Sequence, residues 1–411
     1  MPKLIGPFSQ LLTMNQLPLR GPLRDEELEI IPDAGVLVNH NKIIEVGGFA
    51  ELFKKANHDS LDLVEDKLVA MPGFIDAHTH ICYGGSRAME YSQRISGESY
   101  ESILSTGGGI HHTVSATRSA SYAELLEGLK DRVMRHFLDG VTTIEVKSGY
   151  GLSAEEELRQ LRVIREVGST LPAEIISTCL AAHVVPLESR NEMEYLGNLI
   201  KDLLPVLKKE NLTHRIDIFI EQNSFSPGPA KAYLQSAKDL EFDLAIHADQ
   251  FSVGGSRIAV ELQARSADHL EASGDLEIKR LAASGTAALV LPGSSMGLGV
   301  PFARARSMLD SGCILVIASD WNPGSAPMGD LLLQASVLSA FEKLSAAETF
   351  AAITCRAAHA LGRDDIGRIA PGKLADLVGF STPDYREILY HQGKLKPSLV
   401  WKNSQKFVVK S

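Results

Sequence analysis

The sequence predicts an α/β protein: a (β/α)8 TIM barrel with a small β-sandwich domain formed from the N- and C-terminal segments. Three observations lead to this fold class. Short apolar runs alternate with amphipathic stretches through the middle of the chain, both ends read as short strands and turns, and neither glycine-rich nucleotide motif supports a doubly wound sheet. We expect the small β domain to comprise residues 1–70 and 367–411, and the barrel residues 71–366.

The two ends of the chain are expected to form the small domain together. Residues 35–38 and 42–46 are mostly apolar and flank Asn39-His40-Asn41, a pattern typical of a hairpin. Beyond Gly367 the segments 375–380 and 398–401 are again strand-like. These strands are expected to pair with those of the N-terminal segment, beside the barrel.

Eight short apolar runs are expected to supply the barrel strands. They are Phe74–His80, Val141–Lys147, Glu174–His183, Arg215–Glu221, Phe242–Asp249, Ser266–Leu270, Ala287–Pro292 and Cys313–Asp320. Helical patterns lie between them. The clearest helical pattern begins at Ser153, which together with Glu156 has the form of a capping box. Residues 229–240 and 330–341 have similar helical patterns.

The composition indicates a globular protein and excludes several classes of function. The 411 residues include 41 Lys+Arg and 51 Asp+Glu, a net charge of −10, with 44% hydrophobic residues. We expect no binding to nucleic acid, because such proteins usually carry a basic surface, and no membrane span, because no apolar run approaches about 18 residues. The N-terminus lacks a secretory pattern, and four scattered cysteines indicate free thiols, so we expect a cytoplasmic protein.

Five of the 13 histidines fall at the C-terminal ends of predicted strands: His78, His80, His183, His247 and His269. A barrel gathers these ends on its catalytic face. In His78-Thr79-His80 the two imidazoles point the same way along a strand and can reach one ion. His247 is a good third ligand. Asp320 ends an apolar run, where a carboxylate is costly to bury unless it is paired or binds a cation; the alternative is a helix N-cap.

Other polar residues at these ends suggest an anionic substrate. Arg87 lies on a glycine-containing loop after the first strand, where a guanidinium can hold a carboxylate through paired hydrogen bonds; the alternative is a surface arginine. Tyr150 follows the second strand between two glycines that permit close backbone approach. Gly107-Gly108-Gly109 is either the hinge of a lid or a plain turn.

Several sequence blocks resemble a known family. MPGFIDAHTH at 71–80, the late Asp320 and the closing PGKLADLV resemble the amidohydrolase superfamily of metal-dependent hydrolases. GGSR at 84–87, GGGI at 107–110, KSGYGL at 147–152, AAH at 181–183, HADQ at 247–250 and SDWNPGS at 319–325 are similar to the imidazolonepropionase family within it. The resemblance runs from about residue 35 to the end of the chain.

This resemblance implies a cytosolic, homodimeric enzyme of histidine degradation that opens the ring of 4-imidazolone-5-propanoate to give N-formimidoyl-L-glutamate. It implies one zinc or iron ion per subunit, divalent or trivalent, on His78, His80, His247 and Asp320. The implied substrate contacts are Arg87, Tyr150, His183, Gln250, Asn322, Gly324 and Ser325. The implied catalytic groups are Asp320, His269, Gln250 and His183.

Two positions refine what the resemblance implies. Gln250 stands where some members carry Glu, which shifts proton transfer toward Asp320 and His269. Lys147 lies near a strand end, where binuclear relatives bridge two metals with a carboxylated lysine. Because the remaining ligand set looks mononuclear, we interpret Lys147 as a structural or hydrogen-bonding residue.

Two other functions are open at this point. One is a different amidohydrolase, either another cyclic amidase or an aminohydrolase acting on a purine, pyrimidine or triazine ring. Arg87 and Tyr150 argue against it, because a neutral heterocycle needs no anion clamp. The other is a non-catalytic barrel that has lost its metal, against which the presence of all four candidate ligands argues.

Overall fold

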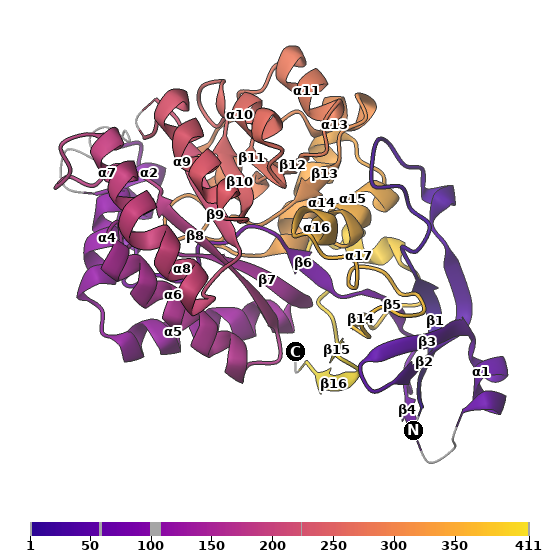
Figure 1. Cartoon of the computed structure of the whole chain (residues 1–411). Coiled ribbons are helices and arrows are strands. Elements are labelled where there is room, and N and C mark those ends of the chain that lie inside the picture. The colour runs from indigo at the N-terminus through magenta and orange to yellow at the C-terminus, as the bar shows by residue number, and fades with distance from the viewer. Residues whose placement is uncertain (1, 57–59, 99–107, 223, 410–411) are drawn as a thin grey trace.

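The computed structural model describes residues 2–56, 60–98, 108–222 and 224–409 (Figure 1). It contains two eight-stranded sheets, one built from the middle of the chain and the other from its two ends. In Figure 1 the indigo N-terminal strands and the yellow C-terminal strands lie side by side, next to the barrel.

The parallel sheet is the predicted barrel. Its strands follow in chain order, β6 to β13. Their bounds are β6 Phe74–Asp76, β7 Val141–Lys147, β8 Glu174–Ala182, β9 Arg215–Ile220, β10 Asp243–Ala248, β11 Ser266–His269, β12 Ala287–Val290 and β13 Leu315–Ile317. The last strand meets the first through a parallel bridge between Thr79 and Trp321, and the Asp320 N–H donates to the His78 carbonyl at 3.1 Å. The predicted TIM barrel is confirmed, with one strand in each predicted run.

Several strands end before the predicted run does. His78 and His80 follow the end of β6, and Asp320 follows the end of β13. Asp320 and Asp249 have φ of 50° and 54°, and His269, at the end of β11, has φ of 86°. A left-handed backbone conformation interrupts a strand, so the chain turns at Asp320 and His269, which were predicted to carry the chemistry, and at Asp249, which was not.

Helices surround the barrel and bury its apolar strands (Figure 1). Ser153 accepts from the Glu156 N–H at 3.3 Å and begins α6, and Asp330 caps α14 by accepting from the Leu333 N–H at 3.0 Å. The helices are α2 Ala88–Ile95, α4 Ile110–Ser119, α5 Tyr122–Leu138, α6 Ala154–Thr170, α7 Glu192–Asn198, α8 Leu204–Glu210, α9 Pro227–Asp239, α10 Gly255–Leu262, α11 Asp275–Ala282, α12 Pro292–Leu298, α13 Ala305–Asp310, α14 Leu331–Glu342, α15 Ala346–Ala352, α16 Cys355–Ala360 and α17 Arg386–Tyr390.

The second sheet joins the two ends of the chain, as the sequence predicted. Its strands are β1 Lys3–Leu12, β2 Ile30–Asn39, β3 Lys42–Gly48, β4 Leu61–Leu63, β5 Val69–Pro72, β14 Leu377–Phe380, β15 Leu399–Lys402 and β16 Gln405–Val408, with helix α1 Phe49–Lys55 after β3. The order β16-β15-β14-β5-β1-β2-β3, with β4 on β1, joins them in one hydrogen-bonded path rather than in two separate sheets. Strands β2 and β3 form the predicted hairpin. The predicted boundary at residue 71 falls inside β5, whose residues pair with β14.

Two further expectations concern the whole chain. All four cysteines are free and buried, as expected for thiols that lie far apart. Within the described ranges, no helix has both the length and the apolar character that crossing a bilayer requires.

Candidate metal centre and active site

The four predicted metal ligands lie together at the C-terminal ends of the barrel strands. The Nε2 atom of His80 is 3.1 Å from that of His78 and 3.2 Å from that of His247. An Asp320 carboxylate oxygen lies 3.4 Å from the His80 Nε2 atom and 3.6 Å from the His78 Nε2 atom. All four side chains are buried. Residues from strand ends far apart in the sequence therefore converge on one point.

Two buried carboxylates fix the orientation of these imidazoles. Asp268 lies 2.7 Å from His78 Nδ1, and Asp217 lies 3.0 Å from His247 Nδ1. A neutral imidazole with its proton on Nδ1, facing a carboxylate, carries a lone pair on Nε2. Lone pairs that converge at about 3 Å repel unless a cation lies between them. The donor set therefore fits a metal ion.

Burial keeps the imidazoles in the neutral form that binds a metal. It lowers the pKa of His78 and His80 well below the ordinary value, and the positive charge of Lys147 contributes in the same direction. Burial also lowers the pKa of His247 to about 4, although Asp217 opposes the shift. Burial raises the pKa of Asp320 to about 6, with His269 opposing. At physiological pH these three imidazoles are therefore neutral, which is the form that binds a metal ion.

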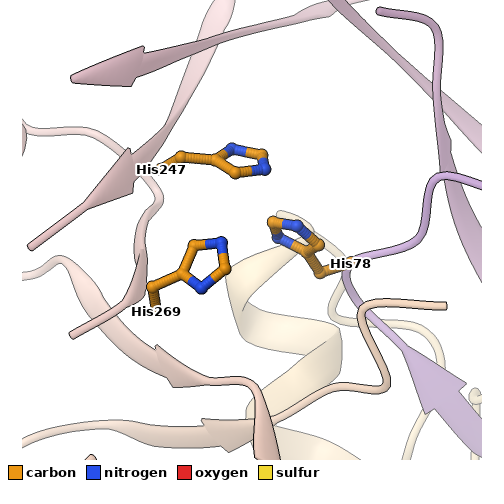
Figure 2. A group of neighbouring side chains, drawn as sticks. All are labelled: His78, His247 and His269. Atoms are coloured by element: carbon orange, nitrogen blue, oxygen red, sulfur yellow. The ribbon is translucent and has the colours of Figure 1, made fainter. Parts of the chain in front are cut away.

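His269 extends the cluster on its other side. Figure 2 shows the rings of His78, His247 and His269 turned toward a common space, and one ligand atom from each lies within 4.8 Å of the others. The ring centroids of His247 and His269 are 5.3 Å apart. Burial alone would lower the pKa of His269, but the carboxylates of Glu271 and Asp320 outweigh it and raise this pKa. His269 is therefore placed to act on a group held at the centre.

Lys147 lies beneath the ligands as a buried hydrogen-bonding residue. Its ammonium is 2.7 Å from Glu145 and 2.9 Å from Asp217, and all three side chains are buried. Burial alone would lower the pKa of Lys147, but these two carboxylates raise it, so the side chain is a cation. Lys147 fixes Asp217, and Asp217 fixes His247. This agrees with the interpretation of Lys147 as a structural or hydrogen-bonding residue.

Removing the charge of Asp217 is expected to weaken metal binding. Asp217→Asn leaves the shape nearly unchanged but removes the carboxylate that orients His247 and neutralises Lys147. Loss of such a second-layer partner typically lowers metal affinity by about 10- to 100-fold. Competition with a chromophoric chelator measures this. The control is Asp243→Asn, whose carboxylate pairs with Arg265 at the start of β10, the strand that carries His247 near its other end. Equal affinity in the two variants would contradict the role of Asp217.

A cavity of about 390 Å³ opens directly above the ligand cluster. The predicted site residues on its wall are His80, Arg87, Tyr150, His183, His247, Gln250, His269, Asp320, Asn322, Gly324 and Ser325. Only His78, among the predicted residues, is not on the wall. The residues that sequence reasoning missed are Arg94, Ile110, Val184, Phe219, Phe251, Leu298 and Val300. Most of these are apolar, and nothing in residue type or spacing distinguishes them from core residues.

Tyr150 and His183 form one side of this cavity. The His183 Nδ1 atom is 3.0 Å from the Gly149 carbonyl and donates its proton there, so that Nε2 is left as an acceptor. Burial lowers the pKa of His183 to about 3, so its ring is neutral. Glu157 accepts from the N–H groups of Gly151 and Leu152, both at 2.8 Å, and holds the loop that carries Tyr150. Sequence reasoning missed Glu157, because it directly follows the capping residue Glu156.

Asn322 organises the loop after β13. Its Oδ1 accepts from the N–H groups of Gly324 and Ser325 at 2.7 and 2.8 Å, and its Nδ2 donates to the Asp320 carbonyl at 2.7 Å. The predicted substrate contact is therefore also the residue that shapes its own loop. Across the cavity, the Gln250 amide donates to Ser294 Oγ at 3.3 Å. The predicted hinge 107–109 lies partly outside the described residues, because Gly107 is not among them.

Gly324 gives Arg87 the space for its position. A Cβ atom at residue 324 would lie 2.2 Å from the Arg87 Nη1 atom. Gly324→Ala is therefore expected to displace the guanidinium and raise the KM for an anionic substrate by about tenfold, the loss of roughly one charged hydrogen bond. Steady-state kinetics measures this, with Gly228→Ala as control, because a Cβ atom there meets nothing within 4 Å. An unchanged KM would show that the guanidinium does not bind the substrate in this position.

Comparison with known proteins agrees with this geometry. The model of the amidohydrolase family matches residues 69–408. Imidazolonepropionase from Bacillus velezensis is 38% identical over 98% of this chain and 96% of its own length. Imidazolonepropionase from Symbiobacterium thermophilum is 39% identical over 95% of this chain and 93% of its own.

Solved structures with the same fold are more distant in sequence. An adenosine deaminase from Xanthomonas campestris with bound zinc has a TM-score of 0.73 at 17% identity, covering 99% of this chain and 92% of its own. Atrazine chlorohydrolase from Arthrobacter aurescens, complexed with zinc, has a TM-score of 0.70 at 17% identity, covering 98% of this chain and 95% of its own. Fold, ligand cluster and sequence therefore agree: the chain belongs to the amidohydrolase family.

Proposed function

We propose that this chain hydrolyses the cyclic amide bond of 4-imidazolone-5-propanoate to give N-formimidoyl-L-glutamate, a step in the degradation of L-histidine. One observation carries the proposal: a single cavity has candidate metal ligands in its floor and Arg87 in its wall. The substrate has a reactive ring carbonyl, which needs the metal site, and an anionic arm, which needs the cation of Arg87. Relatives that align with nearly the whole of this chain are imidazolonepropionases.

The proposed cofactor is one zinc or iron ion per subunit, held by His78, His80, His247 and Asp320. Such an ion, divalent or trivalent, supplies Lewis acidity, which lowers the pKa of water toward about 7 and polarises a carbonyl. Three imidazoles and a carboxylate suit either metal. Metal analysis of the purified protein distinguishes the two.

The residues around the ring have separate roles in this proposal. Arg87 binds the propanoate arm. His183 Nε2 accepts a hydrogen bond from the ring, and Tyr150 fixes its other side. Asp320 takes a proton from the attacking water and delivers it to the departing ring nitrogen as the C–N bond breaks. His269 orients the water or stabilises the developing oxyanion, and Gln250 contacts the substrate without carrying a proton.

Replacing Arg87 is expected to weaken substrate binding more than it harms stability. Arg87→Ala removes the guanidinium from the wall of the cavity but touches no metal ligand. We expect KM to rise by about 10- to 100-fold, the value of a charged hydrogen bond to a carboxylate. Kinetics and a thermal melt on the same preparation test this. An unchanged KM would place the carboxylate elsewhere.

The direct test of the function is to incubate the metal-loaded protein with imidazolone propanoate. Loss of the ring absorbance and formation of formimidoylglutamate are expected in parallel. No change in either would refute the proposed substrate and leave the barrel hydrolase. The second candidate is an aminohydrolase, and release of ammonia from guanine or cytosine would favour it.

Assembly and location are also proposals. We expect a homodimer, which light scattering tests. The four buried free thiols are consistent with a reducing compartment, the cytoplasm.

A further inference from the structure

The guanidinium of Arg87 is already paired inside the cavity. Its Nε and Nη2 atoms both contact one oxygen of Glu90, at 2.9 and 2.8 Å. Glu90 lies on α2, three residues after Arg87, and its side chain is 8% exposed. Within the described part of the chain, Nη1 of Arg87 donates to no protein acceptor. The proposed substrate carboxylate therefore has one edge of the guanidinium available, and Glu90 occupies the other.

Glu90 is held in the charged form by more than Arg87. The Gly109 N–H donates to the same carboxylate oxygen at 3.1 Å, and His112 Nδ1 lies 3.1 Å from the other oxygen. Burial alone would raise the pKa of Glu90, but Arg87, the Gly109 N–H and His112 outweigh it and lower this pKa. The buried side chain is therefore a carboxylate with a full set of partners, beside an anion-binding residue.

This arrangement matters because the reaction adds a second carboxylate. Hydrolysis converts the ring carbonyl into a carboxylate, and the departing ring nitrogen becomes part of a basic amidine that takes up the proton, so a substrate with one carboxylate gives a product with two carboxylates and one amidinium group. Besides the ligand cluster, the cavity wall carries the cations Arg87 and Arg94. A wall with uncompensated positive charge would bind the product more tightly than the substrate and slow its release.

We infer that Glu90 sets the anion affinity of the cavity: it positions Arg87 and at the same time cancels much of its charge, so that the product, with its two carboxylates, can leave. The inference rests on the proposed function and adds a residue that sequence reasoning did not single out. Glu90 is a positioning residue, because it acts on the substrate through Arg87.

Glu90→Gln separates positioning from charge. Its amide oxygen can still accept from Arg87 and Gly109, and its amide nitrogen can donate to His112 Nδ1 in the tautomer that carries its proton on Nε2. At an effective dielectric constant of about 20, repulsion between two like charges about 6 Å apart weakens binding by about a hundredfold relative to a neutral side chain at the same place. The looser ordering of the Arg87 side chain weakens binding by only about threefold to tenfold. The loss of repulsion should therefore dominate.

The expected result for metal-loaded Glu90→Gln is an about tenfold lower Kd for N-formimidoyl-L-glutamate by calorimetry. KM and kcat should fall together, as product release becomes slower. A merely structural role would raise KM. Glu90→Asp keeps the charge and should not bind product more tightly than the wild type. Glu210→Gln is the matched control, because Glu210 forms a similar pair with Arg162, at 2.8 Å, on helix α8.

The outcomes are distinguishable. If Glu90→Gln does not fold, Glu90→Ala provides a second neutral variant with the same expected direction. Product binding that is unchanged or weaker in a folded neutral variant would overturn the inference. The proposed function would still stand in that case, provided that the wild type turns over the substrate. If the wild type forms no formimidoylglutamate, the proposed function fails and this inference fails with it.

Discussion

Asp320→Asn is expected to reduce kcat by about a thousandfold or more, because it removes a metal-facing carboxylate and the proposed proton carrier together. The carboxylate lies within 3.6 Å of the Nε2 atoms of His78 and His80, and burial raises its pKa to about 6. An amide at this position cannot accept a proton from the attacking water. Single-turnover kinetics at saturating substrate measures the loss of the chemical step.

Controls separate loss of chemistry from loss of structure. The melting temperature and the metal content of Asp320→Asn are measured beside those of Asp310→Asn, whose carboxylate pairs with Arg306 at the surface. The surface variant should retain wild-type kcat. Near-normal turnover of Asp320→Asn would refute the role of this carboxylate, because no other change in the site could compensate for it.

Removal of the metal is expected to abolish activity reversibly and to lower the melting temperature. The converging lone pairs of His78, His80 and His247 repel without a cation, and the buried Asp320 carboxylate loses its counter-charge. An ion present at about 1,000 times its Kd contributes about 4 kcal/mol to the free energy of unfolding. Activity, calorimetric melting and metal content are followed through chelation and then reloading with zinc or with iron.

Asp217→Asn is a useful comparison for this experiment. It should bind metal more weakly but recover activity at saturating metal, whereas a chelated wild type should recover at stoichiometric metal. Full activity of a protein shown by elemental analysis to contain no metal would overturn the whole scheme.

The barrel and the convergence of the candidate metal ligands could be predicted from the sequence because each carries a local signal. Eight apolar runs separated by helical patterns indicate parallel strands, and the polar residues that end these runs must meet on one face. The pair His78 and His80 adds the two-residue period of a strand. These signals depend only on neighbours in the chain, so no knowledge of long-range contacts was needed.

The residues that support the ligands could not be predicted in this way. Asp217 and Asp268 lie inside strand runs, where an isolated carboxylate has no recognisable period. Their roles arise only in the folded barrel, where Asp217 meets His247 from the neighbouring strand and Asp268 meets His78, which follows a strand that is not adjacent in the sheet. Glu90 resembles any helical glutamate near an arginine until the backbone of Gly109 is seen to donate to it. The apolar wall of the cavity is likewise indistinguishable from the core by residue type.

The seam where the barrel closes has a consequence for its assembly. The segments of β6 and β13 are joined by the Thr79–Trp321 bridge, by the main-chain hydrogen bonds beside it, and by the Asp76 carboxylate, which accepts from the Ser319 N–H at 3.0 Å. His78 and His80 stand on one side of this seam and Asp320 on the other. The proposed ligation would therefore join the first strand to the last, and we expect part of the free energy of ion binding to stabilise barrel closure. In the apo protein, the amides of His80 and Asp320 should be among the first in the barrel to exchange with solvent.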